Sequence, residues 1–553
     1  MDLDADACYR AIATRDARFD GRLFIAVKST GIYCRPICPA RTPKRENLAF
    51  YPSAAAAQEA GFRPCLRCRP EVAPDLGVWR GTSNTVARAL ALIEKGGLDE
   101  ADVDGLAERL GVGERQLRRL FRRHLGASPV AVAQTRRVLL AKHLIHETRL
   151  PMGEVALAAG FGSVRRFNET FQQLFGRPPS TLRRGSGGAP AGPTGEVAIL
   201  LPYRPPYDWP AILGFLRARA IAGVEVVSGD GYARTIELAG AQGTVAVRPA
   251  SGHALRATIQ FPQLAALPTI VARLRRVFDL AADPEVIGGH LAEDPALAPL
   301  VAARPGLRVA GAWDGFELAV RALLGQQITV TAAVGIAGRL VAAYGKPLTG
   351  PMPGLDGLTH VFPSPERLAE DDLSTLGLTR SRAAALGSLA RAVVADPEIF
   401  GPRRSLDEAI LKLRGLPGIG EWTAQYIAMR EMREPDAFPA ADIGLLRAMA
   451  DRKGRRPTPR ELLARAERWR PWRAYAAQHL WVSQGPTRER SMSYDRRGAL
   501  HDRSPLRTRH GARRATPRMR ADRDPEARHA GAGRSAGRRR AGARGPRHRP
   551  ASR

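Results

Sequence analysis

The sequence predicts a multidomain α+β protein with a small cysteine-rich domain, two all-α domains, an antiparallel β subdomain between them and a disordered basic tail. The chain of 553 residues is long enough for roughly three to four domains. Its 44% hydrophobic and 25% charged residues are typical of a globular protein. The spacing of apolar residues changes along the chain from helical to alternating and back, which predicts separate helical and strand-rich parts.

The balance of charge favours a polyanionic partner. The chain has 85 Lys and Arg against 54 Asp and Glu, a net charge of +31. A basic protein could also bind ribosomes or a membrane surface, so the motifs must decide. No run of about 18 apolar residues predicts a membrane span, and the acidic N-terminus lacks the features of a secretory signal. We therefore expect a cytoplasmic protein with no membrane partner.

Composition divides the chain into six parts. Every cysteine lies in residues 1–76, and residues 83–184 are dense in Leu, Ala and Arg at helical spacing. A stretch rich in Gly and Pro at 185–195 predicts a flexible linker. Residues 196–280 include the alternating segment 233–261, which predicts antiparallel strands. The helical pattern returns from about Leu264 to Trp481 and predicts the largest core, in a domain bounded at 281–485, and residues 486–553 form the tail.

The tail has the composition of a disordered segment. It contains 21 Arg, no Lys and six acidic residues, and it lacks Ile, Val, Phe and Trp. Such a segment cannot bury enough apolar area to offset the entropy cost of ordering it. We favour a solvated extension, or out-of-frame translation of a GC-rich gene, over a nucleic-acid-binding arm.

Four of the five cysteines form two short pairs, C-x3-C and C-x2-C, separated by 26 residues. Four thiolates around a tetrahedral ion are the usual closed arrangement of a zinc site. The sequence therefore predicts a small zinc domain whose ligands are Cys34, Cys38, Cys65 and Cys68, and spacing alone favours a purely structural role. Cys8 lies outside the pattern and is expected to be a small buried residue or a spare thiol.

The sequence around these cysteines, GIYCRPICPARTPKRENLAFYPSAAAAQEAGFRPCLRCRP, closely resembles the N-terminal domain of the Ada family of alkylation-response proteins. The resemblance implies that Cys34 is both a zinc ligand and the nucleophile that accepts a methyl group from a DNA methylphosphotriester. A zinc-held sulfur stays deprotonated at neutral pH, and only the thiolate attacks carbon. Because methylation spends Cys34, the transfer would be stoichiometric.

Methylation would also change the charge of the site. It removes one negative charge from the four-thiolate cluster and so weakens the repulsion between the cluster and DNA phosphates. That change would give the sensor an electrostatic switch. Four nearby cations are candidates for phosphate contacts, although charges beside a surface loop are often only solvated: Arg35, Arg41, Lys44 and Arg45.

Two segments of the second part repeat at an offset of 49 to 50 residues, and each reads as a helix, a glycine-containing turn and a second helix. The matched positions are Leu106 with Val155, Leu110 with Ala159, Gly111 with Gly160, Leu117 with Phe167, Phe121 with Phe171 and Gly126 with Gly176. A helix over about 129–146 would fix the spacing between the two copies. The repeat predicts a double helix-turn-helix.

This repeat resembles the AraC family, whose second motif is close to SVRRFNETFQQLFGRPPSTLR at residues 163–183. The second helix of each copy is expected to enter the major groove of double-stranded promoter DNA. A helical dimerisation module would leave the arginines of both second helices unexplained, although each single Arg could equally neutralise phosphate or stay solvated. RNA polymerase is the protein partner that the resemblance implies. The predicted DNA-binding residues here are Arg115, Arg118, Arg165, Arg166 and Asn168.

A helix-hairpin-helix is predicted at residues 413–430, where LPGIG lies between two helical segments. Its glycines, Gly418 and Gly420, let backbone amides approach a DNA phosphate. Asp442 follows 22 residues after Gly420, and this spacing resembles the helix-hairpin-helix superfamily of DNA glycosylases. Asp442 could also be an ordinary helix N-cap, and Asp436 is the competing carboxylate.

Three further segments look like the AlkA-type family of 3-methyladenine DNA glycosylases (glycosylase II): residues 201–225, 323–333 and 467–481. The resemblance covers roughly residues 196–481 and implies that Asp442 is catalytic. Trp422, Tyr426 and Trp481 would line the base pocket, and Gln327 would be the wedge inserted into the base stack. Some relatives have an apolar residue at the wedge position.

The chemistry fits an alkylated base that carries positive charge, because its glycosidic bond is already weak. The enzyme needs to flip the nucleotide, stack the base on aromatic faces and place a carboxylate beside the developing oxocarbenium ion. Related bifunctional enzymes have a Schiff-base Lys two positions after the last hairpin glycine, where this chain has Trp422. We therefore expect a monofunctional glycosylase that lacks lyase activity and an iron-sulfur cluster.

Together the parts predict an alkylation repair enzyme and adaptive-response regulator: a zinc-thiolate methyl acceptor, a DNA-binding regulator and an alkylbase glycosylase. The sequence contains no Pro-Cys-His-Arg, so direct repair of O6-alkylguanine is not expected. The alternative is a methylation-responsive transcription factor whose glycosylase domain is inactive.

Overall fold

The computed structural model describes residues 4–16, 19–73, 84–94, 96–99, 102–183, 196–349, 355–371, 373–401, 403 and 405–485, with short pieces at 493–494 and 500–501. The linker predicted at 185–195 and most of the predicted tail lie outside the described residues. Within the tail, two short strands are described: β12 (Ser493–Tyr494) and β13 (Leu500–His501).

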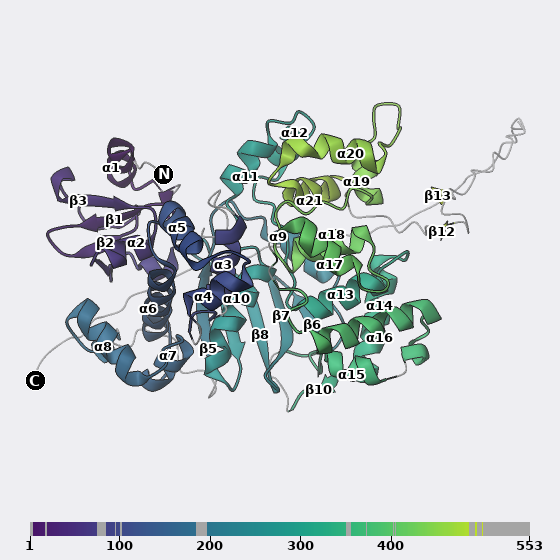
Figure 1. The fold of residues 1–553 in the computed structure, drawn as a ribbon, viewed down its shortest axis with the longest axis horizontal. Helices are drawn as coiled ribbons and strands as arrows, with labels where there is room; N and C mark the ends of the chain where they lie inside the picture. The colour runs from purple at the N-terminus through teal and green to yellow at the C-terminus, as the bar shows by residue number, and fades with distance from the viewer. Residues whose placement is uncertain are drawn as a thin grey trace, which may run out of the picture. The chain divides into compact units, whose positions relative to one another are not determined.

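The first domain is built on a small four-stranded sheet, whose strands lie in the order β3-β1-β2-β4 (Figure 1). β1 pairs antiparallel with β2 and β3, whereas β2 pairs parallel with β4. The buried side chains of Phe24, Tyr33 and Ala57 pack together between the sheet and α2. Its elements are α1 (Ala5–Ala13), β1 (Phe24–Val27), β2 (Ile32–Cys34), η2 (Arg45–Asn47), β3 (Leu48–Tyr51), α2 (Ala54–Glu59), β4 (Arg63–Pro64) and η3 (Pro70–Val72).

The second part is helical and confirms the predicted double helix-turn-helix. The predicted connecting helix is also confirmed, as α6. The elements are α3 (Asn84–Glu94), α4 (Val103–Arg109), α5 (Glu114–Leu125), α6 (Pro129–Glu147), α7 (Met152–Ala158), α8 (Val164–Phe175) and η5 (Pro179–Leu182).

Glycines with positive φ occupy matching positions in the two copies. Gly111 (φ 66°) and Gly160 (φ 84°) form the turns between the helices of each pair. Gly126 (φ 69°) and Gly176 (φ 66°) end the second helices as left-handed C-caps. This backbone conformation is strained for a residue with a Cβ atom, so glycine is the residue that permits both turns and both helix ends.

The third part is a five-stranded antiparallel sheet in the order β5-β9-β8-β7-β6 (Figure 1). Two of its strands lie within the segment 233–261, where alternation predicts strands, and β7 begins two residues before it, but β5, β6 and the helix α9 were not predicted individually. Val197, Ile199 and Leu201 of β5 alternate into the core, each 2% exposed. The elements are β5 (Glu196–Pro202), α9 (Trp209–Arg217), β6 (Glu225–Ser228), β7 (Gly231–Leu238), β8 (Ala241–Ala250) and β9 (Ala254–Gln260).

The fourth part has one large hydrophobic core shared by most of its helices, as the helical pattern predicts, whereas residues 267–277 pack into the core of the five-stranded sheet. Two short strands, β10 and β11, were not predicted. The elements are η6 (Leu264–Ala266), α10 (Leu267–Val277), α11 (Pro284–Leu291), α12 (Ala298–Ala303), α13 (Gly315–Leu324), α14 (Val330–Tyr344), β10 (Lys346–Pro347), β11 (His360–Val361), α15 (Pro365–Glu370), η7 (Leu373–Leu376), α16 (Arg380–Ala395), α17 (Leu406–Arg414), α18 (Glu421–Arg430), α19 (Ile443–Ala448), α20 (Pro459–Ala466), η8 (Glu467–Trp469) and α21 (Arg473–Ser483).

The predicted helix-hairpin-helix is confirmed as α17, a tight turn and α18. Gly418 in the turn has φ 82°, and a Cβ atom built there would lie 2.7 Å from the Ala385 Cβ atom on α16. Gly420 is the N-cap residue of α18 with φ −84°, and nothing lies within 4 Å of the position of its Cβ atom. The turn therefore needs glycine at residue 418 for both backbone and packing reasons. Among the described residues, no helix is long and apolar enough to cross a membrane.

We expect Gly418→Ala to lower the free energy of unfolding of the hairpin-containing domain by about 1–3 kcal/mol, because it combines a strained φ with a close contact. Urea unfolding followed by tryptophan fluorescence will report it, since six of the seven tryptophans lie between residues 209 and 481. Gly420→Ala is the matched control and should cost less than about 1 kcal/mol. Equal losses in the two variants would contradict the packing argument.

Candidate functional site

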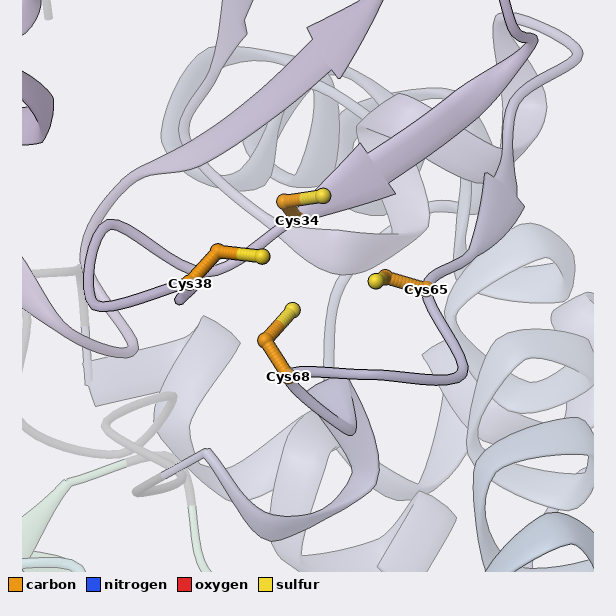
Figure 2. Close-up of side chains that lie close together, drawn as sticks. All are labelled: Cys34, Cys38, Cys65 and Cys68. Atoms are coloured by element: carbon orange, nitrogen blue, oxygen red, sulfur yellow. The ribbon is translucent and has the colours of Figure 1, made fainter. Parts of the chain in front are cut away.

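The four predicted zinc ligands lie together at one end of the first sheet. Their sulfur atoms all lie within 4.8 Å of one another. Figure 2 shows the four side chains pointing toward a common centre. Tetrahedral zinc with Zn–S bonds of about 2.3 Å needs sulfurs about 3.8 Å apart, so this donor set fits zinc. Cys34 ends β2, and Cys65 and Cys68 follow β4, which pairs with β2.

The four sulfurs differ in their surroundings. Cys65 and Cys68 are each 7% exposed, and their sulfurs accept hydrogen bonds from the backbone amides of Arg67 and Arg35, both at 3.3 Å. Cys34 is half-buried, and no backbone amide of the described residues donates to its sulfur. Cys38 is half-buried as well, so both residues of the first pair are more exposed than Cys65 and Cys68. Cys8 is buried on α1, outside the cluster, in agreement with its predicted place.

Arg35 stabilises the loops that carry the predicted zinc ligands. Its Nε atom donates to Asp20 Oδ1 at 2.8 Å, and a terminal nitrogen donates to the Cys68 carbonyl at 3.2 Å. The guanidinium forms a salt bridge with the buried Asp20. Arg45 likewise pairs with Asp6. The charge of Arg35 is therefore paired inside the domain, and its contact with phosphate stays a prediction.

A buried ion pair connects the zinc loop to the long helix α6. Lys142 is 0% exposed, donates to the Cys65 carbonyl at 3.0 Å and pairs with Glu71. Burial would raise the pKa of Glu71, but the charge of Lys142 lowers it below the usual value. Burial also lowers the pKa of Lys142. The backbone of a predicted zinc ligand is thus hydrogen-bonded to the helix between the two helix-turn-helix copies.

The predicted DNA-reading residues are exposed on α5 and α8. Arg118 pairs with Glu114 and Arg165 pairs with Glu169, each one turn away on its own helix. Among the described residues, Arg115 and Arg166 have no ion pair, and their side chains and that of Asn168 are exposed. Ser163 caps α8 by accepting from the Arg166 amide at 3.1 Å.

Asp442 has a carboxylate that accepts hydrogen bonds from three helices. The indole nitrogens of Trp422 on α18 and Trp481 on α21 donate to its two oxygens, each at 2.8 Å. The amides of Gly444 and Leu445 donate to Oδ1 at 2.9 and 3.0 Å. Asp442 is therefore the N-cap of α19, which is the structural role considered for it. It also lies within an aromatic cluster, which its predicted catalytic role requires.

Asp436, the competing carboxylate, is committed to salt bridges. Arg473 donates to both of its oxygens at 2.7 and 3.0 Å, and Arg470 pairs with it as well. Burial raises the pKa of Asp436, although Arg473 and Arg470 oppose that change. The aromatic residues surround Asp442 instead, so Asp442 is the better candidate for chemistry.

The three aromatic residues predicted for the base pocket lie around this carboxylate. The rings of Trp422 and Tyr426 stack at 5.2 Å between centroids and 10° between planes. A Cβ atom at Gly444 would lie 3.2 Å from Trp481, so the small residue allows the indole to approach the helix N-terminus. All three aromatic residues are half-buried.

The predicted wedge lies in the turn between α13 and α14. Gln327 is exposed and has φ 60°, an unusual value for a residue with a side chain. The neighbouring Gln326 instead faces the hairpin, where its Nε2 atom donates to the Gly418 carbonyl at 2.9 Å and to Thr423 Oγ1 at 3.2 Å. The turn is thus anchored through Gln326 and presents Gln327 outward.

Sequence reasoning missed several residues of this cluster. Arg430 lies one helical turn beyond Tyr426 on α18, and its guanidinium is 4.9 Å from the Tyr426 ring and 5.8 Å from the Trp481 ring. Phe215 on α9 and the following Arg219 join the cluster from the β-rich part. The i, i+4 spacing of Tyr426 with Arg430, and of Phe215 with Arg219, was the available signal.

Four family models match the chain in order. They are the metal binding domain of Ada (residues 7–71), a helix-turn-helix domain (106–185), the AlkA N-terminal domain (198–314) and the HhH-GPD superfamily of base excision DNA repair proteins (320–474). With the four-cysteine cluster and the hairpin, they define a zinc-binding, DNA-binding repair protein that carries a DNA glycosylase domain.

Relatives with curated names agree. The chain is 42% identical to the "Probable bifunctional transcriptional activator/DNA repair enzyme AlkA" of Mycobacterium tuberculosis, over 88% of this chain and 99% of the relative. It is 37% identical to DNA-3-methyladenine glycosylase 2 of Escherichia coli, over 52% of this chain and 97% of that protein. It is 32% identical to the bifunctional activator/repair enzyme AdaA of Bacillus subtilis, over 33% of this chain and 83% of the relative. The chain belongs to the family of AlkA-type bifunctional transcriptional activators and DNA repair enzymes.

We expect the purified protein to contain one zinc ion per chain and Cys65→Ala to lose it, because the removed sulfur leaves only three ligands. Elemental analysis after extensive dialysis is the measurement. Cys8→Ala, which removes a buried thiol outside the cluster, should keep its zinc. Zinc retained in full by Cys65→Ala would contradict the four-sulfur site.

Proposed function

We propose that the protein hydrolyses the N-glycosidic bond of alkylated purines such as 3-methyladenine in DNA, and that Cys34 accepts a methyl group from DNA methylphosphotriesters to switch on sequence-specific transcription. The observation that carries the first activity is the Asp442 carboxylate between two tryptophans behind a helix-hairpin-helix. The second rests on the half-buried Cys34 among four converging sulfurs.

In the glycosylase step, the flipped nucleotide enters beside Trp422, Tyr426 and Trp481, whose electron-rich faces attract a cationic base. The carboxylate of Asp442 then stabilises the positive charge that develops on the sugar as the bond between C1′ and the base nitrogen breaks. The electron pair of that bond leaves with the base. Water adds to the sugar and completes the hydrolysis.

DNA is held by the hairpin and the wedge turn. The backbone amides near Gly418 and Gly420, at the start of α18, would bind a phosphate. Gln327 would fill the space that the flipped nucleotide leaves. Because Trp422 occupies the position of the Schiff-base Lys in bifunctional relatives, the enzyme acts as a monofunctional hydrolase.

In the methyl-transfer step, the Cys34 sulfur attacks the methyl carbon of the phosphotriester. A carbon–sulfur bond forms, the carbon–oxygen bond breaks, and the DNA phosphodiester leaves as an anion with the electron pair. Cys34, Cys38, Cys65 and Cys68 would hold a zinc ion, which would keep the Cys34 sulfur deprotonated before the attack. The product thioether carries no charge, so the cluster is less negative and binds DNA more readily.

The two second helices would read promoter DNA through Arg115, Arg118, Arg165, Arg166 and Asn168. The exposed Arg115 and Arg166 have the freedom that such contacts need. RNA polymerase as a partner, a cytoplasmic and nucleoid-associated location, and the domain limits at residues 76, 83, 184, 195, 280 and 485 stay predictions of the sequence.

We expect Asp442→Asn to lower the release of 3-methyladenine from methylated DNA by at least about 100-fold, because the amide cannot stabilise the positive sugar. Chromatography of the released bases measures it. The DNA strand should stay intact at the abasic site until alkali is added.

Asp451→Asn is the control for this experiment, since Asp451 is an exposed carboxylate in another loop. It should release the base at the rate of the unsubstituted protein. No release from any of the three proteins would instead favour the alternative, a methylation-responsive transcription factor with an inactive glycosylase domain.

Incubation with methylphosphotriester DNA should add one methyl group to the peptide that contains Cys34 and Cys38, and fragmentation should place it on Cys34, because the first pair is more exposed than Cys65 and Cys68. Peptide mass spectrometry after digestion is the measurement, and the peptide with Cys65 and Cys68 is the internal control. A methyl group on the control peptide alone would refute the assignment of the nucleophile.

A further inference from the structure

The aromatic cluster next to Asp442 also contacts Arg430, which lacks a carboxylate partner among the described residues. Arg430 is 3% exposed, and its guanidinium lies 4.3 Å from the Phe215 ring as well as against Tyr426 and Trp481. It donates to the Ala310 carbonyl at 2.6 Å and approaches the Gln478 side-chain oxygen at 3.5 Å. Its Nε atom has no hydrogen-bond partner in the part of the chain that the structure describes.

Arg321, a neighbouring half-buried arginine, shows the contrast. It forms salt bridges with both Glu225 and Glu317, and these acids neutralise it. The described part of the chain shows no salt bridge for Arg430 or for Arg219, whose guanidinium lies 4.0 Å from the Phe215 ring. Burial lowers the pKa of Arg430, as do the charges of Arg219 and Arg433, although Tyr426 opposes them. Within the described ranges, the guanidinium groups of Arg430 and Arg219 therefore lie against aromatic rings and form no salt bridge with an acid.

The positive charge of these two arginines changes the pKa of an aromatic residue in the cluster. Burial alone would raise the pKa of Tyr426, but Arg430 and Arg219 lower it below that of an ordinary tyrosine. Asp442 accepts hydrogen bonds from the indole nitrogens of Trp422 and Trp481. The cluster thus contacts a negative group at its indole nitrogens and two positive groups at its rings.

This arrangement matches the charge separation of the proposed reaction, on which the inference rests. When the glycosidic bond breaks, the sugar becomes positive beside Asp442 and the base gains the electron pair beside the guanidinium groups. For a base that is neutral before cleavage, the transition state is attracted to the arginines although the ground state is not. A cationic base is repelled by them when it binds and is still partly repelled in the transition state.

We propose that Arg430, together with Arg219, is a specificity determinant that favours damaged purines that are uncharged before cleavage over cationic ones. Half an elementary charge developing about 7 Å from one guanidinium, at an effective dielectric constant of about 20, corresponds to about a tenfold change in rate. The aromatic faces and Asp442 act on both classes of base, whereas the arginines favour the uncharged class over the cationic class.

The test compares DNA with hypoxanthine, a neutral damaged base, and DNA with 7-methylguanine, a cationic one, using the full chain. Arg430→Gln keeps a donor for the Ala310 carbonyl but removes the charge. We expect it to lower kcat/KM for hypoxanthine about tenfold and to leave the value for 7-methylguanine unchanged or higher. Arg430→Lys, which restores the charge, should recover most of the preference.

Arg219→Gln provides a second route if Arg430→Gln does not fold, because Arg219 is only half-buried. It should shift the ratio of the two substrates in the same direction, whereas Arg217→Gln, an exposed neighbour on α9, should not. Equal losses for both bases in the charge-removing variants, or no release of hypoxanthine by the unsubstituted protein that releases 7-methylguanine, would overturn the inference. Release of neither base would overturn the proposed glycosylase function itself.

Discussion

The arrangement of the glycosylase part depends on one carboxylate and the donors that hold it. Asp442 accepts from two indole nitrogens and two backbone amides, so the ends of α18, α19 and α21 must meet at one point. Leu445 belongs to the large hydrophobic core of this part, and Trp481 packs against that core. The tryptophans therefore have two roles, since they fix the orientation of the carboxylate and at the same time present their faces beside it.

The same constraint explains the small residues nearby. Gly444 leaves room for Trp481 against the start of α19, and Gly418 leaves room for Ala385 against the hairpin. Helices that approach this closely allow few substitutions, because an added methyl group would displace an indole or a neighbouring helix rather than a flexible chain end. Close packing and polar geometry thus support one another around the site.

The sequence could predict the parts of the molecule whose signals are local. The cysteine spacing, the repeated glycines of the helix-turn-helix copies and the hairpin glycines each require a particular backbone or ligand geometry, and those elements formed as expected. It could not predict contacts between distant segments. Phe215 and Arg430 are 215 residues apart along the chain and come into contact only in the folded structure. The sequence also did not show that Arg35 forms a salt bridge with the buried Asp20. The small sheet of the first domain was also missed, because its strands are only two to four residues long.

The buried pair of Lys142 and Glu71 crosses the boundary that composition suggests at residues 76–83. A gene fusion that replaced only the segment before this boundary would leave an ammonium group in the interior with no counter-ion, a defect that typically costs about 3–5 kcal/mol. The four-cysteine segment and the helices after it are therefore expected to exchange between proteins as one unit, whereas the glycine-rich stretch at 185–195 is a more favourable place for recombination.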